Sequence, residues 1–307
     1  MSLLNKRHFT SEKYAFKYLE SIIWPEGPVC PKCGSCTKPY DLGKTRVGLK
    51  KCRDCKKQFT VKVGTVFESS HIPLHKWMQA VYLICSSKKG ISAHQLHRTL
   101  EITYKTAWFM CHRIRVAMEE GTLPPIGGEG QIVQADETYF GKKANPPTVK
   151  TSGQPFIKSG KAAAKLAVIT LVSGGKSRTF HVDRADAAIV RQILKDNVKP
   201  ETELHTDESR LYTKVGKEFA KHETVKHTAG EYYRDGVHTN KCENYFSIFK
   251  RGMRGVYQHC SEKHLQRYLS EFDFRYNNRE SDDALRTEKA LAGIVGKRIM
   301  YRDSSMV

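Results

Sequence analysis

Long apolar runs are missing from this sequence, and their absence excludes the membrane-spanning class of proteins. No stretch reaches the roughly 18 consecutive apolar residues that indicate a transmembrane helix. The first 27 residues also lack the uninterrupted apolar core and the small-residue cleavage site of a secretory signal. We therefore expect a chain that stays in the cytoplasm.

Acidic residues are also scarce relative to basic ones. Lys and Arg total 52 against 32 Asp and Glu, which gives a formal net charge of +20. A field of this sign suits a polyanion such as nucleic acid, and no basic amphipathic segment favours the competing partner, a membrane surface. With 307 residues and 39% hydrophobic content, the chain can bury one substantial core and has room for a second, smaller module. We predict a globular, nucleoid-associated protein without a membrane partner.

Four of the nine cysteines follow a metal-binding pattern. Cys30 and Cys33 form a C-x2-C pair, and Cys52 and Cys55 form a second pair after eighteen intervening residues. Each pair can present two thiolates to one tetrahedral Zn²⁺, and the spacer is long enough for a hairpin. Four thiolates close the coordination shell, so the predicted zinc is structural. The alternatives are a redox pair, chance spacing, or Cys36 as a substitute ligand.

Residues 67 to 120 are predicted to be helical, and the last helix, over residues 104 to 120, carries a basic face. One side of it carries Lys105, Trp108, His112 and Arg115. Thr103 is placed to cap this helix, and Ser92 is placed to cap the helix before it. Two helices joined by a short turn are typical of a helix-turn-helix reader of DNA. Such a helix would contact bases through Tyr104, Lys105 and Trp108. A helical spacer with a solvated charged face explains the same pattern.

The pattern changes after the Pro- and Gly-rich stretch 121–130, which we interpret as a linker. Segments rich in Val, Ile, Thr and aromatic residues at 131–140, 165–172 and 177–183 predict three antiparallel strands. A helical stretch at 186–198 leads to further strands at 202–208 and 223–228. The predicted fold is α/β, of the ribonuclease-H type, with a mixed sheet flanked by helices. In that arrangement the first and fourth strands pair, so acidic residues on them lie side by side.

Asp136 and Asp207 are the acidic residues of those two strands. Each emerges from an apolar strand, where an unpaired charge is costly, so a cation is the natural partner. Strand alternation turns the neighbouring acids, Glu137 and Glu208, to the opposite face. The third ligand should come from a later helix, on which Glu243 lies in a polar stripe beside an apolar face.

The polar stripe of that later helix suggests phosphodiester chemistry. It consists of Asn240, Glu243, Ser247 and Lys250, beside an apolar face of Cys242, Tyr245, Phe246, Phe249 and Met253. Three carboxylates can hold two Mg²⁺ or Mn²⁺ ions about 3.5 to 4 Å apart, one activating the attacking oxygen and one stabilising the leaving oxygen. The ammonium group of Lys250 can bind a phosphate. Water would be the nucleophile for cleavage and a DNA 3′-hydroxyl the nucleophile for joining.

The order Asp136, Asp207, Glu243, with 70 and then 35 intervening residues, resembles the DDE transposase and integrase superfamily. More closely, the two cysteine motifs, ADETYFGKK, HTN-x2-EN-x4-FKRGMRGVY and HLQRYLSEFDFRYNNR resemble the zinc-ribbon insertion-sequence transposases of the ISXO-like group. The resemblance implies cut-and-join mobilisation, with terminal inverted repeats and target DNA as double-stranded partners, and a homodimer or higher oligomer on DNA. Because an Asn can serve at the third position in this group, Asn240 rivals Glu243, and His238 can assist.

Basic residues near the predicted site are further candidates for DNA contact. The stretch 141–165 contains six lysines and no acidic residue, so it is either a solvated loop or a clamp on the DNA backbone through Lys142 and Lys143. Arg251 is a further predicted DNA contact. His205 shares a strand face with Asp207 and has either a structural or a proton-transfer role.

The sequence thus predicts six segments and leaves three rival functions. The segments are an N-terminal helix (1–28), a zinc ribbon (29–66), a helical region (67–120), a linker (121–130), a catalytic domain (131–278) and a C-terminal tail (279–307). The rivals are a non-catalytic DNA-binding regulator, a nuclease that only hydrolyses, and a tyrosine or serine recombinase that forms a covalent protein-DNA adduct. Fold alone does not separate the first two from a transposase, which the resemblance favours.

Overall fold

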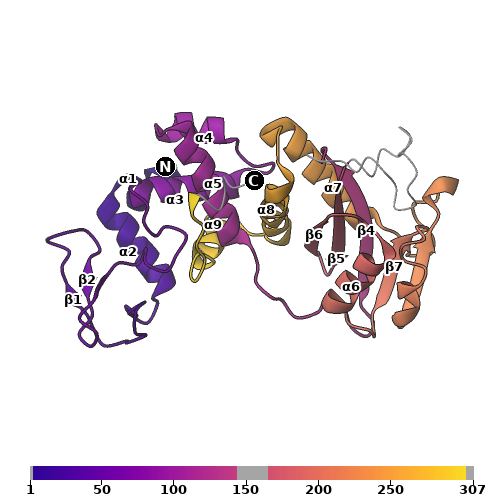
Figure 1. Ribbon diagram of the computed structural model, residues 1–307, viewed down its shortest axis with the longest axis horizontal. Coiled ribbons are helices and arrows are strands. Elements are labelled where there is room, and N and C mark those ends of the chain that lie inside the picture. The colour runs from indigo at the N-terminus through magenta and orange to yellow at the C-terminus, as the bar shows by residue number, and fades with distance from the viewer. Residues whose placement is uncertain (1–2, 144–164, 302–307) are drawn as a thin grey trace, which may run out of the picture. The chain divides into compact units, whose positions relative to one another are not determined.

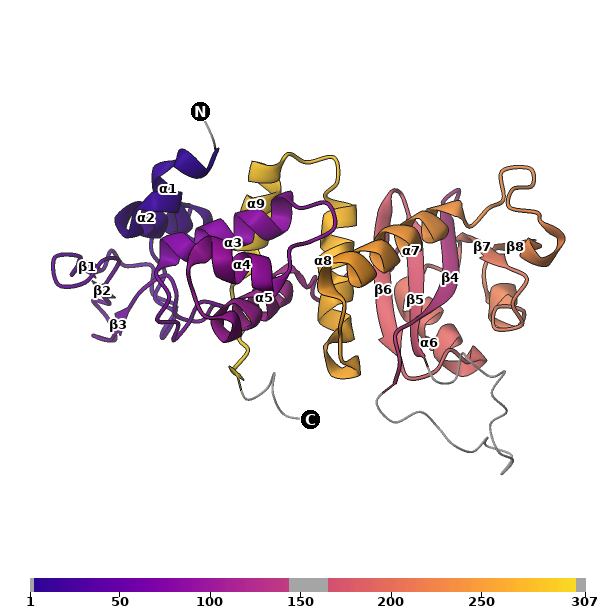
Figure 2. The same cartoon turned by 90° about the horizontal axis from the view of Figure 1, so that it is seen from above.

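The computed structural model describes residues 3–143 and 165–301, and it divides the chain into two compact units (Figures 1 and 2). Unit 1 consists of residues 1–119 and 278–307, and unit 2 consists of residues 120–277. Most of the lysine-rich stretch predicted at 141–165 lies outside the described residues. The finer division predicted within each unit stays a prediction.

Unit 1 is built around helix α3. Its helices are α1 (Arg7–Thr10), α2 (Glu12–Ile23), α3 (Leu74–Ser86), α4 (Ala93–Leu100), α5 (Tyr104–Met118) and α9 (Asp283–Ala292), with a 3-10 turn at Leu3–Asn5. Each of the other five helices contacts α3. The apolar residues Trp77, Val81, Ile84 and Cys85 of α3 are buried in this packing, as their helical spacing predicts.

Side chains cap the helices of unit 1 at their starts. The hydroxyl of Ser92 accepts a hydrogen bond from the backbone N–H of Gln95 at 3.1 Å, and the hydroxyl of Thr103 accepts one from Thr106 N–H at 3.2 Å. Both caps were predicted from the sequence, and each satisfies a backbone donor that the first helical turn leaves open. Thr103 lies in the short connection between α4 and α5, which contact each other.

The predicted basic face of α5 is wrong beyond the first helical turn. His112 and Arg115 were placed on a free face, but they are 0% and 3% exposed. Helix α5 is packed against α3, α4 and α9, so it has little free surface beyond its first turn. Helix α9 lies within the residues predicted to be a C-terminal tail. Tyr104 and Lys105, in the first turn, are exposed.

A small antiparallel sheet lies between α2 and α3 in the sequence. Its strands β1 (Tyr40–Asp41), β2 (Lys50–Lys51) and β3 (Gln58–Phe59) pair in the order β1-β2-β3. Strands of two residues bury little apolar surface, and the core of this segment consists mainly of Cys30, Cys52 and Phe59. A segment with so small a core needs another source of stability, such as a bound metal.

Unit 2 is a five-stranded mixed sheet flanked by helices. Its elements are β4 (Ile132–Phe140), β5 (Leu166–Ser173), β6 (Lys176–Val182), α6 (Ala187–Asn197), β7 (Glu203–Asp207), β8 (Lys221–Val225), α7 (Asn240–Gly252) and α8 (Leu265–Asn277). Short 3-10 turns lie at Val215–Glu218, His227–Ala229 and Glu262–His264, and a π-helical segment at Met253–Tyr257 follows α7. The strand order is β6-β5-β4-β7-β8, with β4 antiparallel to β5 and parallel to β7. This confirms the predicted α/β class and the pairing of the first and fourth strands.

The two faces of the sheet bury separate apolar cores. On one face, Val133 and Ala135 of β4 pack with Val190 and Leu194 of α6. On the other face, strand residues pack with the apolar face of α7, which was predicted in full, and with α8 (Figure 2). Because side chains alternate along a strand, the even-numbered residues of β4, including Asp136, belong to the α7 face.

Candidate functional site

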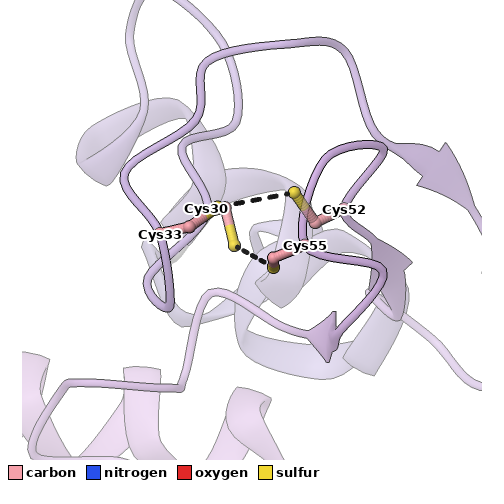
Figure 3. Close-up of side chains that lie close together, drawn as sticks. All are labelled: Cys30, Cys33, Cys52 and Cys55. Atoms are coloured by element: carbon pink, nitrogen blue, oxygen red, sulfur yellow. Dashed lines mark hydrogen bonds between the residues drawn. The ribbon is translucent and has the colours of Figure 1, made fainter.

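The four thiols of the predicted zinc site converge in unit 1 (Figure 3). The Sγ atoms of Cys30 and Cys55 are 3.7 Å apart, as are those of Cys33 and Cys52, and all four lie within 4.8 Å of one another. A tetrahedral Zn²⁺ with Zn–S bonds of about 2.3 Å separates its sulfurs by about 3.8 Å. The arrangement therefore fits a closed zinc site. Cys36 is exposed and lies outside the group, so the structure does not support it as a substitute ligand.

Tight turns hold each cysteine pair. Cys30 N–H donates to the carbonyl of Ser35, and Gly34 has a φ of 73°. In the second pair, Cys52 N–H donates to the carbonyl of Lys57, and Lys56 has a φ of 59°. A left-handed residue after each pair lets the chain fold back around the sulfurs, and this conformation is unstrained for Gly34.

A second group of metal-ligand side chains lies just beyond the point where the pairing of β4 with β7 ends. The two strands pair from Ile132–Glu203 to Gln134–His205, and continuing this register places Asp136 opposite Asp207. Carboxylate oxygens of Asp136, Glu137 and Asp207 lie within 4.8 Å of one another. The parallel pairing of the two strands thus brings together carboxylates that are 71 residues apart in the sequence.

Glu137 belongs to this group, which corrects the prediction that it points away. Strand alternation does turn its side chain toward the α6 face, where Tyr212 O–H donates to its carboxylate at 2.8 Å and Ser209 O–H donates at 3.4 Å. However, the paired part of β7 ends near this point, so a long side chain can reach the carboxylates at the sheet edge. Glu208, the other dismissed acid, is outside the group and accepts a hydrogen bond from Thr228 N–H.

The electrostatics of the acidic group favour a divalent cation. The pKa of Asp136 is raised to about 8. Burial is the largest cause, and the charges of Glu137, Asp207 and Glu243 contribute as well. Burial also raises the pKa of Glu137. Clustered carboxylates repel one another when ionised, and a hard cation that accepts oxygen ligands removes that repulsion. The residues present therefore fit a divalent metal site.

Helix α7 is held next to this edge by a residue that the sequence analysis missed. The side chain of Gln134, two residues before Asp136 on the same face, accepts a hydrogen bond from Lys241 N–H at 3.0 Å. Its amide group also contacts Nδ1 of His238 at 2.9 Å. A buried Gln among apolar strand residues was the available signal, because such a group needs partners.

The polar stripe of α7 lies near the acidic group, but its predicted ligand is not part of it. Glu243 is 40% exposed and pairs with Nε2 of His227 at 3.6 Å. Its charge nevertheless raises the pKa of Asp136. Lys250 is half-buried, and burial lowers its pKa, Arg254 lowers it further, and Asp136 raises it. Asn240 is exposed at the start of the helix.

The remaining predicted residues are scattered over the two units. In unit 2, His205 is buried, and its Nε2 lies 3.1 Å from the carboxylate of Glu203. Arg251 and Lys142 are exposed. The ammonium group of Lys143 contacts the carbonyl oxygen of Asp183. In unit 1, the ring of Tyr104 stacks on His94 at 4.2 Å, and Trp108 packs against His112. The choice between a structural and a proton-transfer role for His205 stays a prediction.

Comparisons with known proteins match both regions of the chain. A family model described as an ISXO2-like transposase domain matches residues 127–277, and one described as a transposase zinc-ribbon domain matches residues 10–58. The chain is also similar to an uncharacterized protein in transposable element ISH50 from Halobacterium salinarum. The two are 31% identical over 280 residues, which span 87% of this chain and 91% of the relative. In the described parts of the chain, no helix has the length and apolarity needed to cross a membrane.

The four-thiol site predicts that zinc stabilises residues 29–66. Cys52→Ser should lose bound zinc and lower the thermal unfolding temperature of unit 1, because three thiolates leave the coordination shell incomplete. Cys36→Ser is the matched control and should keep both the metal and the stability. Metal content by plasma mass spectrometry and thermal unfolding measure the two effects. Equal zinc loss in both variants would contradict the assignment.

The raised pKa of Asp136 predicts that unit 2 becomes less stable as pH rises when divalent cations are chelated. The folded protein keeps this proton up to about pH 8, whereas the unfolded chain releases it near pH 3.8. The folded state therefore binds more protons between these values, and the free energy of unfolding falls as pH increases through that window.

Asp136→Asn should flatten this dependence between pH 5 and 8, whereas Glu208→Gln should leave it unchanged because the pKa of Glu208 is lowered. Thermal unfolding in chelator across this range is the measurement, and added Mg²⁺ should offset the loss in wild type. The same slope in wild type and Asp136→Asn would show that the carboxyl group does not titrate in this way.

Proposed function

The chain belongs to the ISXO2-like transposase family, and from that premise we propose its reaction and its DNA partner. It binds the terminal inverted repeats of its own insertion sequence and cleaves the ends by metal-dependent phosphodiester hydrolysis. It then joins the freed 3′-hydroxyl to target DNA by transesterification. The observation that carries this proposal is the meeting of Asp136 and Asp207 on two adjacent parallel strands.

The two aspartates have the surroundings that such a reaction needs. Asp136 is buried, whereas Asp207 is the last residue of β7 and is partly exposed, which leaves one of the two carboxylates accessible to a DNA strand. Bound Mg²⁺ or Mn²⁺ would activate the attacking oxygen and stabilise the leaving oxygen. The protein side chains hold the ligand oxygens in place, and Tyr212 and Ser209 orient Glu137 by hydrogen bonds.

The third ligand is drawn from Glu243, Asn240 and Glu137. Glu243 is favoured by its effect on the pKa of Asp136, and it is partly exposed and able to turn toward the site. Asn240 occupies the adjacent position on the same stripe, at the start of α7. Glu137 is within 4.8 Å of both aspartates, but its hydrogen bonds to Tyr212 and Ser209 favour a positioning role.

Basic groups around the acidic edge are suited to the DNA backbone. Lys250 lies close enough to Asp136 for the two charges to affect each other, with Arg254 and Lys165 nearby. We assign Lys250 to a phosphate near the cleaved bond, and Arg251, Lys142 and Lys143 to the flanking backbone. In unit 1, Tyr104, Lys105 and Trp108 of α5 are proposed to contact the inverted repeat. Two or more subunits assemble on the DNA ends.

Two rival functions use the same scaffold, and product analysis separates them. A non-catalytic regulator would bind DNA without cutting it, and a purely hydrolytic nuclease would cut without joining. A recombinase with a covalent intermediate would leave protein attached to DNA after detergent treatment. The metal-ligand grouping at the sheet edge favours cleavage over the regulator, and family membership favours joining over hydrolysis alone.

A strand-transfer assay tests the proposal. Purified wild-type protein, a labelled DNA end from its own element and Mg²⁺ should give joined products that disappear in chelator. Asp136→Asn and Asp207→Asn should each lower product formation by more than about 100-fold, the scale on which loss of a charge-stabilising group acts. Glu208→Gln, which removes a neighbouring carboxylate outside the group, should leave activity unchanged.

The same assay assigns the third ligand. If Glu243 is the ligand, Glu243→Gln should reduce activity as strongly as the aspartate changes, and Asn240→Ala should have a small effect. The reverse order would assign Asn240, and a dominant effect of Glu137→Gln would assign Glu137. Wild-type protein that binds the DNA end but forms neither cleaved nor joined product would contradict the proposed function.

A further inference from the structure

Unit 1 contains a cavity beside the exposed first turn of α5 to which no function has been assigned. Its volume is about 400 Å³, which is in the lower part of the range of about 300 to 1,000 Å³ for small-molecule sites. A cavity of this size accommodates one nucleotide but not a double helix. Its lining comes from the segment before α3, from α3 and α5, and from Tyr301, which follows α9.

The walls of the cavity are aromatic and apolar. Trp77, Phe109 and Met110 line it, with Tyr301 at its side. The rings of Phe109 and Tyr301 meet edge to face at 5.5 Å, and the indole N–H of Trp77 donates to the hydroxyl of Ser70, so its polar atom is satisfied. Flat apolar surfaces of this kind bind the faces of unstacked bases in single-stranded nucleic acids.

Two cationic side chains line the cavity among neutral polar ones. Arg113 lines it, is 7% exposed and stacks its guanidinium 4.7 Å from the Phe109 ring centroid. One of its terminal nitrogens donates to the carbonyl of Glu68, but its buried Nε has no acceptor among the described residues. Lys105, exposed in the first turn of α5, is the second cation. A buried guanidinium with unused hydrogen-bonding capacity favours a ligand with acceptor atoms, such as a base or a phosphate.

An adjoining cavity is lined by two further basic residues and two acidic ones. It has a volume of about 530 Å³, shares Ser69 and Ser70 with the first cavity and is lined by Arg46 and Lys62. Its acidic groups are engaged within the protein. Glu12 accepts hydrogen bonds from the start of α3 and pairs with His75, while Glu68 accepts from Gly64 N–H and pairs with Arg298. The excess of positive charge therefore lies in the first cavity, which Lys105 and Arg113 line without an acidic residue.

We propose that the cavity lined by Phe109, Arg113 and Lys105 binds one nucleotide of the element's end DNA, unstacked from its duplex. The base lies against the aromatic wall and accepts a hydrogen bond from Arg113, and Lys105 at the rim binds a neighbouring phosphate. This inference rests on the proposed function, because it assumes that the end DNA is the ligand of unit 1. The position beside Tyr104 and Trp108 places the cavity next to the helix turn proposed to contact that DNA.

Unstacking a base requires free energy that a mismatch reduces, and this difference provides the test. The full-length protein is titrated with end duplexes that each carry one mismatch, made by changing only the strand opposite the scanned base. Both strands are scanned. At one position the mismatch should tighten binding to wild type by about 10-fold, because the pair is already weakened, and elsewhere it should have no effect or weaken binding.

Pocket variants show whether this cavity receives the base. Phe109→Leu keeps the apolar volume but removes the ring, and Arg113→Gln removes the guanidinium. In both, the tightening at that position should disappear. Arg98→Gln is the matched control, because Arg98 lines a neighbouring cleft and not this cavity, and the tightening should persist. Thermal unfolding and zinc content check that each variant is folded.

The outcomes distinguish this inference from the proposed function. Specific binding to the end DNA with no position at which a mismatch tightens it would overturn the nucleotide pocket alone, even if neither pocket variant folds. Tightening that persists in both folded pocket variants would do the same. Failure to bind the end DNA in preference to unrelated DNA would overturn the proposed function and, with it, this inference.

Discussion

The burial and mutual repulsion of carboxylates where the pairing of β4 with β7 ends are the main physical constraint on unit 2. Parallel pairing sets Asp136 beside Asp207, and Glu137 reaches the same edge from the other face of the sheet. Burial is the largest cause of the raised pKa of Asp136, and the charges of Glu137 and Asp207 add to it. Hydrogen bonds around the carboxylates keep their backbone in place. Gln134 accepts one from the start of α7, and Tyr212 donates one to Glu137. A divalent cation bound there would offset the repulsion and, in the proposed function, would serve phosphate chemistry.

The zinc site of unit 1 also gathers groups that ionise to anions, but its geometry is closed where that of the carboxylate group is open. Four thiols within 4.8 Å can close a tetrahedral shell and leave no position for substrate. The carboxylate site supplies few protein ligands and lies at the edge of a sheet, which leaves coordination positions for water and phosphate oxygens. The first arrangement suits folding of a segment with a very small core, and the second suits a reaction.

Much of this could be predicted from the sequence wherever periodicity or spacing carried the information. The cysteine spacing identified the zinc ribbon, and the strand pattern placed Asp136 and Asp207 on paired strands. The position of Glu137 could not be predicted from strand alternation. Alternation gives the face of the sheet on which a side chain starts, but a long side chain can still bring its carboxylate to groups on the other face. The buried positions of His112 and Arg115 could not be foreseen, since they depend on how α5 packs with α3, α4 and α9, which helical periodicity alone does not give. The third ligand stays undecided because Glu243 and Asn240 share one helix stripe.

The central claim is that Asp136 and Asp207 share a divalent cation. The most direct measurement is anomalous scattering from crystals of the protein grown with end DNA and Mn²⁺, collected near the manganese edge. The account predicts a manganese peak within direct coordination distance of carboxylate oxygens from both aspartates. A well-ordered edge of β4 and β7 without such a peak, or manganese bound only at other carboxylates, would contradict it.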